Sequence, residues 1–277
     1  MKSSRELTPR TGRLKLDSGT LFWHEYGQGR TIVFLHGSWQ DSLQWSPLIT
    51  ALGAHFHCLA PDLLGFGESR SNHTAYSIAL QVEALAAFLK ALRVSKCILV
   101  GHSLGAWVAT QFALQYPGQV ENLVVIAPEG LDPTLNRKRW WLHQRLAGRY
   151  SLFMLGLSAS SPLIKLVGAH DWLRHTLSLR QQLRQFPAAC RILFKRRSAE
   201  IRGELVQLQL SELAVPAMVL LADASTPLDQ ALSKAFFSAL PTAVIKTLSE
   251  GDTAWGMALE PTIAVLQDLS PHMRAVP

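Results

Sequence analysis

The sequence has few cysteines and no long apolar run, and each shortage excludes a class of protein. Its three cysteines, among 277 residues, form no close pair and no spacing typical of a metal site. We therefore predict neither a disulfide framework nor a metal centre, and we expect no cofactor. No uninterrupted apolar stretch is long enough to cross a bilayer, and residues 1–7 lack the apolar region of a signal peptide. We expect a cytoplasmic protein that is at most peripheral to a membrane.

Acidic residues are scarce between residues 131 and 202. The chain has a formal net charge of +7, but this segment holds fourteen Lys and Arg against three acidic residues and carries +11, so the rest carries −4. Trp140 and Trp141 follow a basic triplet here, and residues 150–164 contain no charge. We expect the arginines to face solvent, and a cationic, Trp-bearing segment favours contact with an anionic membrane surface. No nucleic-acid-binding module is recognisable, so nucleic acid is not an expected partner.

The most informative motif lies at residues 97–106. An apolar stretch ends in the run GHSLG at residues 101–105, and a helical pattern follows at once. Gly-X-Ser-X-Gly between a strand and a helix is typical of a sharp turn that exposes the serine hydroxyl. The glycines suit a turn that a Cβ would obstruct, and the helix N-terminus favours developing negative charge. The motif therefore predicts Ser103 as a nucleophile.

Apolar runs alternate with helical patterns through most of the chain. The predicted extended segments are a hairpin over 13–26 and strands at 31–36, 55–60, 96–100, 122–127, 215–222 and 244–248. The predicted helices are 42–52, 77–92, 104–116, 228–240 and 259–269. Strands that alternate with helices indicate an α/β protein with a mostly parallel sheet covered on both faces.

Three segments, in order, resemble the α/β-hydrolase superfamily. They are TIVFLHGS at residues 31–38, APDLLGFGES at residues 60–69, and the turn at 101–105. The resemblance implies an α/β-hydrolase fold: a mostly parallel eight-stranded sheet flanked by helices, formed by residues 1–130 and 213–277. A helical cap would be inserted at residues 131–212. It also implies a small apolar substrate or ligand, and an oxyanion hole formed by the amides of Ser38 and Leu104.

The base and acid that the family uses have no counterparts at their expected positions. Counting back from Pro261 places Ala254 or Trp255 where the family carries its histidine, and neither side chain accepts a proton. Ser225 stands where the family carries its aspartate. The remaining candidate acids are Glu129, Asp132, Asp223 and Asp229. The candidate bases from the cap are His170 and His175, with His143 also in that segment; they are otherwise ordinary surface histidines, and His36 and His102 are expected to be structural.

These residues support two functions. The first is a serine hydrolase of esterase or lipase type on an apolar ester, with a non-standard or weak triad. The alternative is a catalytically silent protein that binds a lipid, a pigment or a partner protein in its cleft. Loss of the histidine alone costs subtilisin on the order of 10⁶ in turnover, whereas an oxyanion hole with binding leaves roughly 10³–10⁴ over water. A serine without a positioned base therefore predicts slow hydrolysis.

Overall fold

The computed structural model describes residues 9–131, 133–148, 170–223, 225–240, 242–251, 253 and 255–269, and the side chains of 133–139 and 170 lie outside this description. The described part contains one sheet in the order β1-β2-β4-β3-β6-β7-β8-β9, with β5 beside β2. Neighbouring strands from β4 through β9 run parallel, and the pairs that involve β2 are antiparallel. The strands are β1 (Arg10–Leu16), β2 (Gly19–Tyr26), β3 (Arg30–Leu35), β4 (Phe56–Pro61), β5 (Arg70–Ser71), β6 (Cys97–His102), β7 (Val120–Ile126), β8 (Ala217–Ala222) and β9 (Val244–Leu248).

This sheet confirms the mostly parallel α/β fold expected from the sequence, with one addition. The eight strands of the main order correspond to the eight predicted strands, and the predicted hairpin is β1 with β2. β5 is two residues long and pairs with Gly19 and Thr20. A strand this short has no alternation that a sequence pattern can reveal.

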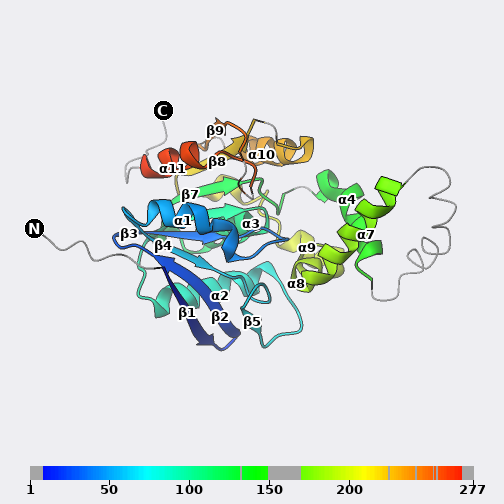
Figure 1. Ribbon diagram of the computed structural model, residues 1–277, viewed down its shortest axis with the longest axis horizontal. Helices are drawn as coiled ribbons and strands as arrows, with labels where there is room; N and C mark the ends of the chain where they lie inside the picture. The colour runs from blue at the N-terminus through cyan, green and yellow to red at the C-terminus, as the bar shows by residue number, and fades with distance from the viewer. Residues whose placement is uncertain are drawn as a thin grey trace, which may run out of the picture.

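Helices cover both faces of the sheet (Figure 1). Residues of α2, α3 and α10 belong to the hydrophobic core on one face, and those of α1 and α11 to the core on the other. The predicted helix start at Ser77 is confirmed, because its hydroxyl accepts a hydrogen bond from the Leu80 amide at 3.0 Å. The flanking helices are η1 (Ser42–Trp45), α1 (Ser46–Leu52), α2 (Ile78–Ala91), α3 (Leu104–Gln115), η2 (Pro117–Gln119), α10 (Pro227–Ala239) and α11 (Leu259–Gln267).

Successive residues of the central strands alternate between these two cores. In β6, Leu99 packs in the core under α2 and α3, whereas Ile98 and Val100 pack in the core under α1 and α11. All three side chains are at most 1% exposed. A strand buried on both faces reads as a continuous apolar run, which is the pattern that precedes the GHSLG turn. Burial of this strand holds the start of the turn in place.

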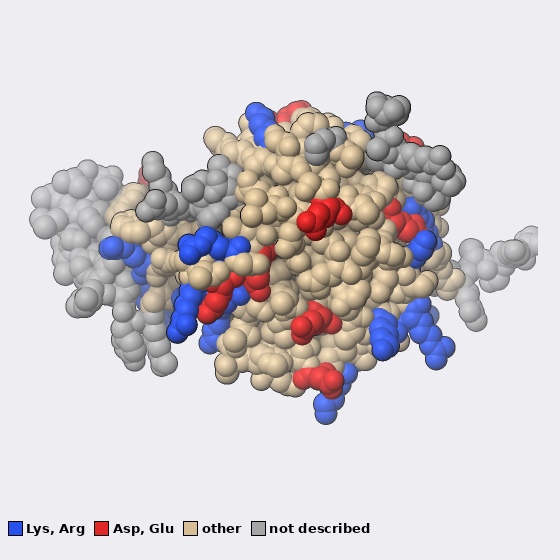
Figure 2. Space-filling model, turned by 180° about the vertical axis from the view of Figure 1, so that it is seen from behind, with Lys and Arg blue, Asp and Glu red and all other residues tan. Residues whose placement is uncertain are grey.

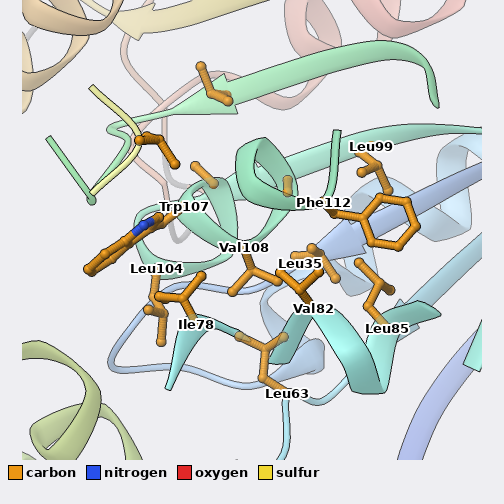
Figure 3. Packing of buried hydrophobic residues seen from close by; sticks show 14 of the residues in the cluster. Leu35, Leu63, Ile78, Val82, Leu85, Leu99, Leu104, Trp107, Val108 and Phe112 are labelled. Atoms are coloured by element: carbon orange, nitrogen blue, oxygen red, sulfur yellow. The ribbon is translucent and has the colours of Figure 1, made fainter. Parts of the chain in front are cut away.

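Helix α3 begins directly after the turn and packs between the sheet and α2 (Figure 3). Figure 3 shows Leu104 and Val108 of α3 among side chains from β3 and α2, including Leu35 and Ile78. Gly105 permits the helix to approach β3 closely, because a Cβ there would lie 2.2 Å from the carbonyl oxygen of Leu35. The glycine is therefore required by packing of the helix start against the sheet.

We expect Gly105→Ala to destabilise the protein by about 1–3 kcal/mol, because the added methyl group overpacks a contact with backbone atoms. Gly118→Ala is the matched control, since a Cβ at Gly118 meets nothing within 4 Å. Urea unfolding followed by circular dichroism gives both free energies of unfolding. Equal values for the two variants would show that α3 does not need this close approach.

Four helices of the predicted cap lie together at one end of the molecule (Figure 1). They are α4 (Pro133–Leu146), α7 (His170–Gln185), α8 (Pro187–Cys190) and α9 (Ser198–Gly203). The segment also contains the π-helical turn η3 (Arg191–Lys195) and the short helix η4 (Leu210–Glu212), whose Leu210 belongs to the core on the α10 face of the sheet. The uncharged run at 150–164 lies outside the described residues. The boundaries of the cap at 131 and 212 stay a prediction.

Several cationic side chains of the cap make structural hydrogen bonds, which corrects the expectation that they all face solvent. Arg180 donates to the carbonyl oxygens of Leu146 and Gly148, and Lys195 donates to that of Ala147, so both bond to carbonyls at the end of α4. A helix end leaves such carbonyls without intrahelical partners, and cations there are favourable. On the face shown in Figure 2, Lys and Arg gather at the two ends of the molecule, one of which is the cap.

Candidate active site

Ser103 lies at a strained turn between β6 and α3. Its backbone has φ +52° and ψ −113°, a conformation that residues with a Cβ rarely adopt. The Ser103 amide donates to the carbonyl oxygen of Ile126 at 2.9 Å, and the Ser103 carbonyl accepts from the amides of Ala106 and Glu129. These bonds connect the turn to β7 and to the loop after it. The predicted sharp turn is therefore present, and the surrounding backbone holds it.

The Ser103 hydroxyl faces a cavity of about 160 Å³ together with the hydroxyl of Ser38. Their Oγ atoms are 3.2 Å apart, so that one hydroxyl donates to the other. Ser38 is 1% exposed, and Leu104 is the first residue of α3, where amides have no intrahelical acceptor. Their role as an oxyanion hole stays a prediction. The cavity is lined by Gly37, Ser38, Trp39, Gln40, His102, Ser103, Ala127, Glu129, Gln182 and Asp229.

His36 is buried, and both of its ring nitrogens form hydrogen bonds. Its Nε2 accepts a hydrogen bond from the amide of Leu63 at 3.0 Å, and its Nδ1 donates to the carbonyl oxygen of Gly37 at 2.9 Å. Burial lowers the pKa of this imidazole, and the Gly37 hydrogen bond opposes the shift. A ring with both nitrogens engaged cannot take a proton from Ser103, in agreement with the structural role predicted for it.

Among the histidines that the structure describes, His102 alone lines the Ser103 cavity. Burial lowers its pKa to about 4, although the carboxylate of Asp229 opposes the shift. The ring is therefore neutral at pH 7 and a weak proton acceptor. Its Nδ1 has no hydrogen-bond partner among the described residues. A Cβ on Gly37 would lie 2.6 Å from this nitrogen, so the glycine makes room for the ring.

A second cavity, of about 270 Å³, lies where the family would place its histidine and aspartate. His102, Ala127 and Asp229 line both this cavity and the Ser103 cavity, so the two adjoin. Trp255 is 7% exposed and stacks on Trp45 with ring centroids 4.7 Å apart. An indole N–H only donates, so Trp255 offers no base. The second cavity is lined by His102, Ile126, Ala127, Leu220, Leu221, Ala222, Ser225, Thr226, Asp229, Ser233, Glu250, Trp255 and Gly256.

The candidate acids differ in where the structure places them. Glu129 is 3% exposed and lines the Ser103 cavity. Asp229 lies at the start of α10 and lines both cavities, and its carboxylate accepts from the Thr226 hydroxyl at 2.7 Å. Asp223 is exposed and lines neither cavity, so the structure does not bring it to Ser103. Asp132 lies outside the described residues, as does Ala254 at the predicted base position.

The predicted bases of the cap are not brought to the Ser103 cavity in the described part of the chain. His175 is exposed on α7 and is absent from the lining, whereas Gln182, two turns further along the same helix, is part of it. The side chain of His170 lies outside the described residues. His143 is buried and stacks on Trp39 with ring centroids 6.0 Å apart, and Trp39 lies between His143 and the cavity that it lines. Sequence reasoning missed Trp39 and Gln182, for which no motif gave a signal.

The cap forms a third cavity, of about 480 Å³, which adjoins the first at Glu129. It contains two arginines, Arg196 and Arg202, and is otherwise largely apolar and aromatic. Its lining is Trp107, Glu129, Gly130, Leu131, Trp140, Trp141, Gln144, Leu193, Phe194, Arg196, Ser198, Ile201, Arg202 and Leu205. An apolar pocket of this size can hold a small ligand.

Comparisons with curated proteins find similarity over part of the chain. A pimeloyl-(acyl-carrier protein) methyl ester esterase from Vibrio atlanticus is 38% identical over 110 residues, which are 40% of this chain and 41% of that protein. An uncharacterized protein from Mycobacterium tuberculosis is 32% identical over 146 residues, 51% of this chain and 41% of the relative. The aligned region thus spans less than half the length of these relatives.

Solved structures match over nearly the whole chain. A thermophilic esterase from Thermogutta terrifontis has a TM-score of 0.67 at 18% identity and covers 94% of this chain and 97% of its own. Est816, an N-acyl homoserine lactone degrading enzyme, has a TM-score of 0.68 at 18% identity, and the match covers 94% of this chain and 100% of Est816. Similarity at this identity establishes the fold alone. The profile of the alpha/beta hydrolase family matches residues 32–268, and the chain therefore belongs to that family.

Proposed function

We propose that the protein hydrolyses an apolar ester slowly, with Ser103 as the nucleophile. The observation that carries this proposal is the Ser103 hydroxyl, held at a backbone of φ +52° and placed 3.2 Å from the Ser38 hydroxyl in a cavity. Strain of this kind persists where surrounding structure enforces it, and it clusters at functional sites. The start of α3 directs its dipole toward negative charge that develops beside Ser103.

The chemistry follows from the groups that line the Ser103 cavity. Ser103 Oγ attacks the ester carbonyl carbon, and the amides of Ser38 and Leu104 stabilise the resulting oxyanion. The Ser38 hydroxyl accepts the Ser103 proton and passes its own toward the carboxylates of Glu129 and Asp229. The ester C–O bond then breaks, the alcohol leaves with a proton, and water hydrolyses the acyl-enzyme. A carboxylate is a weaker base than imidazole, so each step is slow.

The third cavity supports an apolar acyl group as the substrate. Its aromatic and aliphatic lining shares Glu129 with the Ser103 cavity, and we propose that an ester held at Ser103 extends past this residue under the cap. The relative from Vibrio atlanticus is named as a methyl ester esterase and the structural neighbour from Thermogutta terrifontis as an esterase, and both names agree with an ester substrate. The alternative function, a silent protein that binds a ligand in this cleft, shares the cavity but not the acylation step.

Labelling with a fluorophosphonate probe tests the proposal. We expect slow, covalent labelling of one residue, located at Ser103 by peptide mass spectrometry, because the probe needs the same attack by the hydroxyl. The Ser103→Ala variant should remain unlabelled. If the intact protein takes up no probe between pH 6 and pH 9, the silent binding protein becomes the better account.

We also propose that the cap contacts an anionic membrane surface. Trp141 on α4 is 53% exposed, and Trp172 and Leu177 on α7 are 51% and 46% exposed. Arg145 lies over the Trp141 ring at 4.2 Å, whereas Arg174 on α7 forms an ion pair with Asp171, the residue before Trp172. An exposed indole beside a cation suits the headgroup region of a bilayer. No helix of the described residues is long and apolar enough to span a membrane.

Sedimentation with vesicles measures this contact. We expect binding to phosphatidylglycerol-containing vesicles and none to pure phosphatidylcholine, with Trp172→Ala weakening the affinity about tenfold because burial of a large apolar side chain is lost. Leu43→Ala is the control, since Leu43 is 58% exposed on η1, outside the cap. Equal losses for both variants, or no binding by the parent protein, would refute the contact.

A further inference from the structure

The 270 Å³ cavity behind His102 has a polar wall, of which the proposed acylation uses Asp229 alone. It lies between the end of β8, the start of α10 and the loop before α11. Its volume is close to the lower end of small-molecule sites, roughly 300–1,000 Å³. Because it adjoins the Ser103 cavity through His102, Ala127 and Asp229, a molecule held there lies next to the proposed nucleophile.

Unpartnered polar atoms concentrate in the residues that line this cavity. Seven buried side-chain nitrogen and oxygen atoms in the described residues have no hydrogen-bond partner, and four of them belong to this lining. They are His102 Nδ1, Ser225 Oγ, Ser233 Oγ and Trp255 Nε1. Ser233 is 0% exposed and Trp255 is 7% exposed. A buried polar atom without a partner destabilises a protein. His102 Nδ1 and the two serine oxygens can accept a hydrogen bond, so they point to a bound group that donates, whereas Trp255 Nε1 only donates and gains no partner from such a group.

The charge of the lining residues indicates whether the bound group is a cation or an anion. Asp229 and Glu250 contribute carboxylates, and no Lys or Arg is among the lining residues. His102 adds no positive charge at pH 7, because burial lowers its pKa to about 4. The cavity therefore attracts cations and repels anions. Serine hydroxyls and carboxylates both accept hydrogen bonds, so N–H groups on the cation would be matched.

We propose that this cavity binds a small organic cation that carries N–H groups, such as an alkylammonium or imidazolium ion. The carboxylates of Asp229 and Glu250 balance its charge, and the hydroxyls of Ser225 and Ser233 accept its N–H groups. Binding does not depend on the proposed ester hydrolysis. The cation is either a separate molecule or the amino end of an ester held at Ser103, since the two cavities adjoin.

Titration calorimetry with defined ions tests the site on the Ser103→Ala variant, in which acylation is impossible. We expect imidazolium and ethylammonium chloride to bind saturably at millimolar concentration. Tetramethylammonium, which has the charge but no N–H group, should bind about tenfold more weakly, and acetate should not bind. Equal heats for all four ions, or none, would mean that the cavity holds water only and would overturn the proposal.

Substitutions in the cavity lining test whether the ion binds in this cavity. Asp229→Asn should weaken imidazolium binding about tenfold, because the shape of the side chain is kept while its charge is removed. Asp223→Asn is the matched control: this carboxylate also follows β8 but lines neither cavity. If Asp229→Asn fails to fold, Glu250→Gln replaces it, since Glu250 is exposed and lines the same cavity. Unchanged affinity in the folded cavity variants would place the ion elsewhere and refute the site.

A comparison of two esters separates the two sources of the cation. An aminoethyl ester and its uncharged, isosteric propyl ester share the same acyl group. A KM at least tenfold lower for the amino ester assigns the cation to the substrate, whereas equal KM values together with calorimetric binding of imidazolium assign it to a separate ligand. A protein that cleaves neither ester but binds imidazolium refutes the proposed hydrolysis and leaves the cation site standing.

Discussion

Ester hydrolysis by the Ser103→Ala variant should fall about 100-fold below that of the parent protein. A positioned proton acceptor contributes roughly 10²–10⁴-fold, and the lower end applies because carboxylates rather than an available imidazole line the Ser103 cavity. A complete triad would lose far more, on the order of 10⁶ in turnover. Initial rates with p-nitrophenyl butyrate, measured over a range of substrate concentrations, give the loss in kcat and in kcat/KM.

The size of this loss distinguishes slow hydrolysis by Ser103 from hydrolysis without Ser103 and from efficient hydrolysis with a positioned base. Ser178→Ala, at an exposed serine of α7, is the control and should keep the parental rate. If the Ser103→Ala variant hydrolyses the ester as fast as the parent, Ser103 is not the nucleophile. A loss near 10⁶ would instead mean that an efficient base acts on Ser103 and that slow turnover is the wrong expectation.

Imidazole should accelerate ester hydrolysis by the parent protein about ten- to a hundredfold. The 270 Å³ cavity adjoins the Ser103 cavity, so a neutral imidazole whose N–H donates to the Asp229 carboxylate can supply the proton acceptor that His102, Trp255 and Ser225 do not provide. The imidazolium that forms when it takes the Ser103 proton is the cation that the cavity favours. The gain stays below that of a built-in histidine because a free molecule must first be bound and oriented. Rates at increasing imidazole concentration, corrected for the reaction of imidazole alone, should saturate.

Two controls show whether the acceleration acts through Ser103. The Ser103→Ala variant should respond no more than buffer does, and Asp229→Asn should need about tenfold more imidazole for half of the effect, because the bound base loses the carboxylate that accepts its N–H. A linear, unsaturated response that is the same in all three proteins would mean that imidazole attacks the ester in solution and that the cavity plays no part.

The turn at Ser103 could be predicted because its determinants are local. An apolar run buried on both faces, two glycines and an immediate helical pattern specify it within ten residues, and the structure has β6, the turn and α3 at those positions. The lack of a base at Trp255 was equally readable from the sequence. That the indole stacks on Trp45 in the core depends on two segments far apart in the chain, and no local pattern encodes such a contact.

The rest of the candidate site depends on how distant elements meet. Gln182 enters the Ser103 cavity because α7 of the cap lies over it, and His175 on the same helix stays exposed. Asp229 and Asp223 both follow β8 in sequence, but the turn into α10 brings only Asp229 to the cavities. Helical spacing places residues on one face of a helix, yet it does not say where along the helix a neighbouring cavity opens. That information arises with tertiary packing.

The measurement that tests the central claim most directly is the mass of the protein during ester hydrolysis. If Ser103 attacks the ester and deacylation is also slow, incubation with p-nitrophenyl butyrate should yield a butyrylated protein whose modified peptide contains Ser103. The adduct should be absent from Ser103→Ala and should decay faster when imidazole is added. Hydrolysis without any adduct on this peptide, or an adduct on another residue, would contradict Ser103 as the nucleophile.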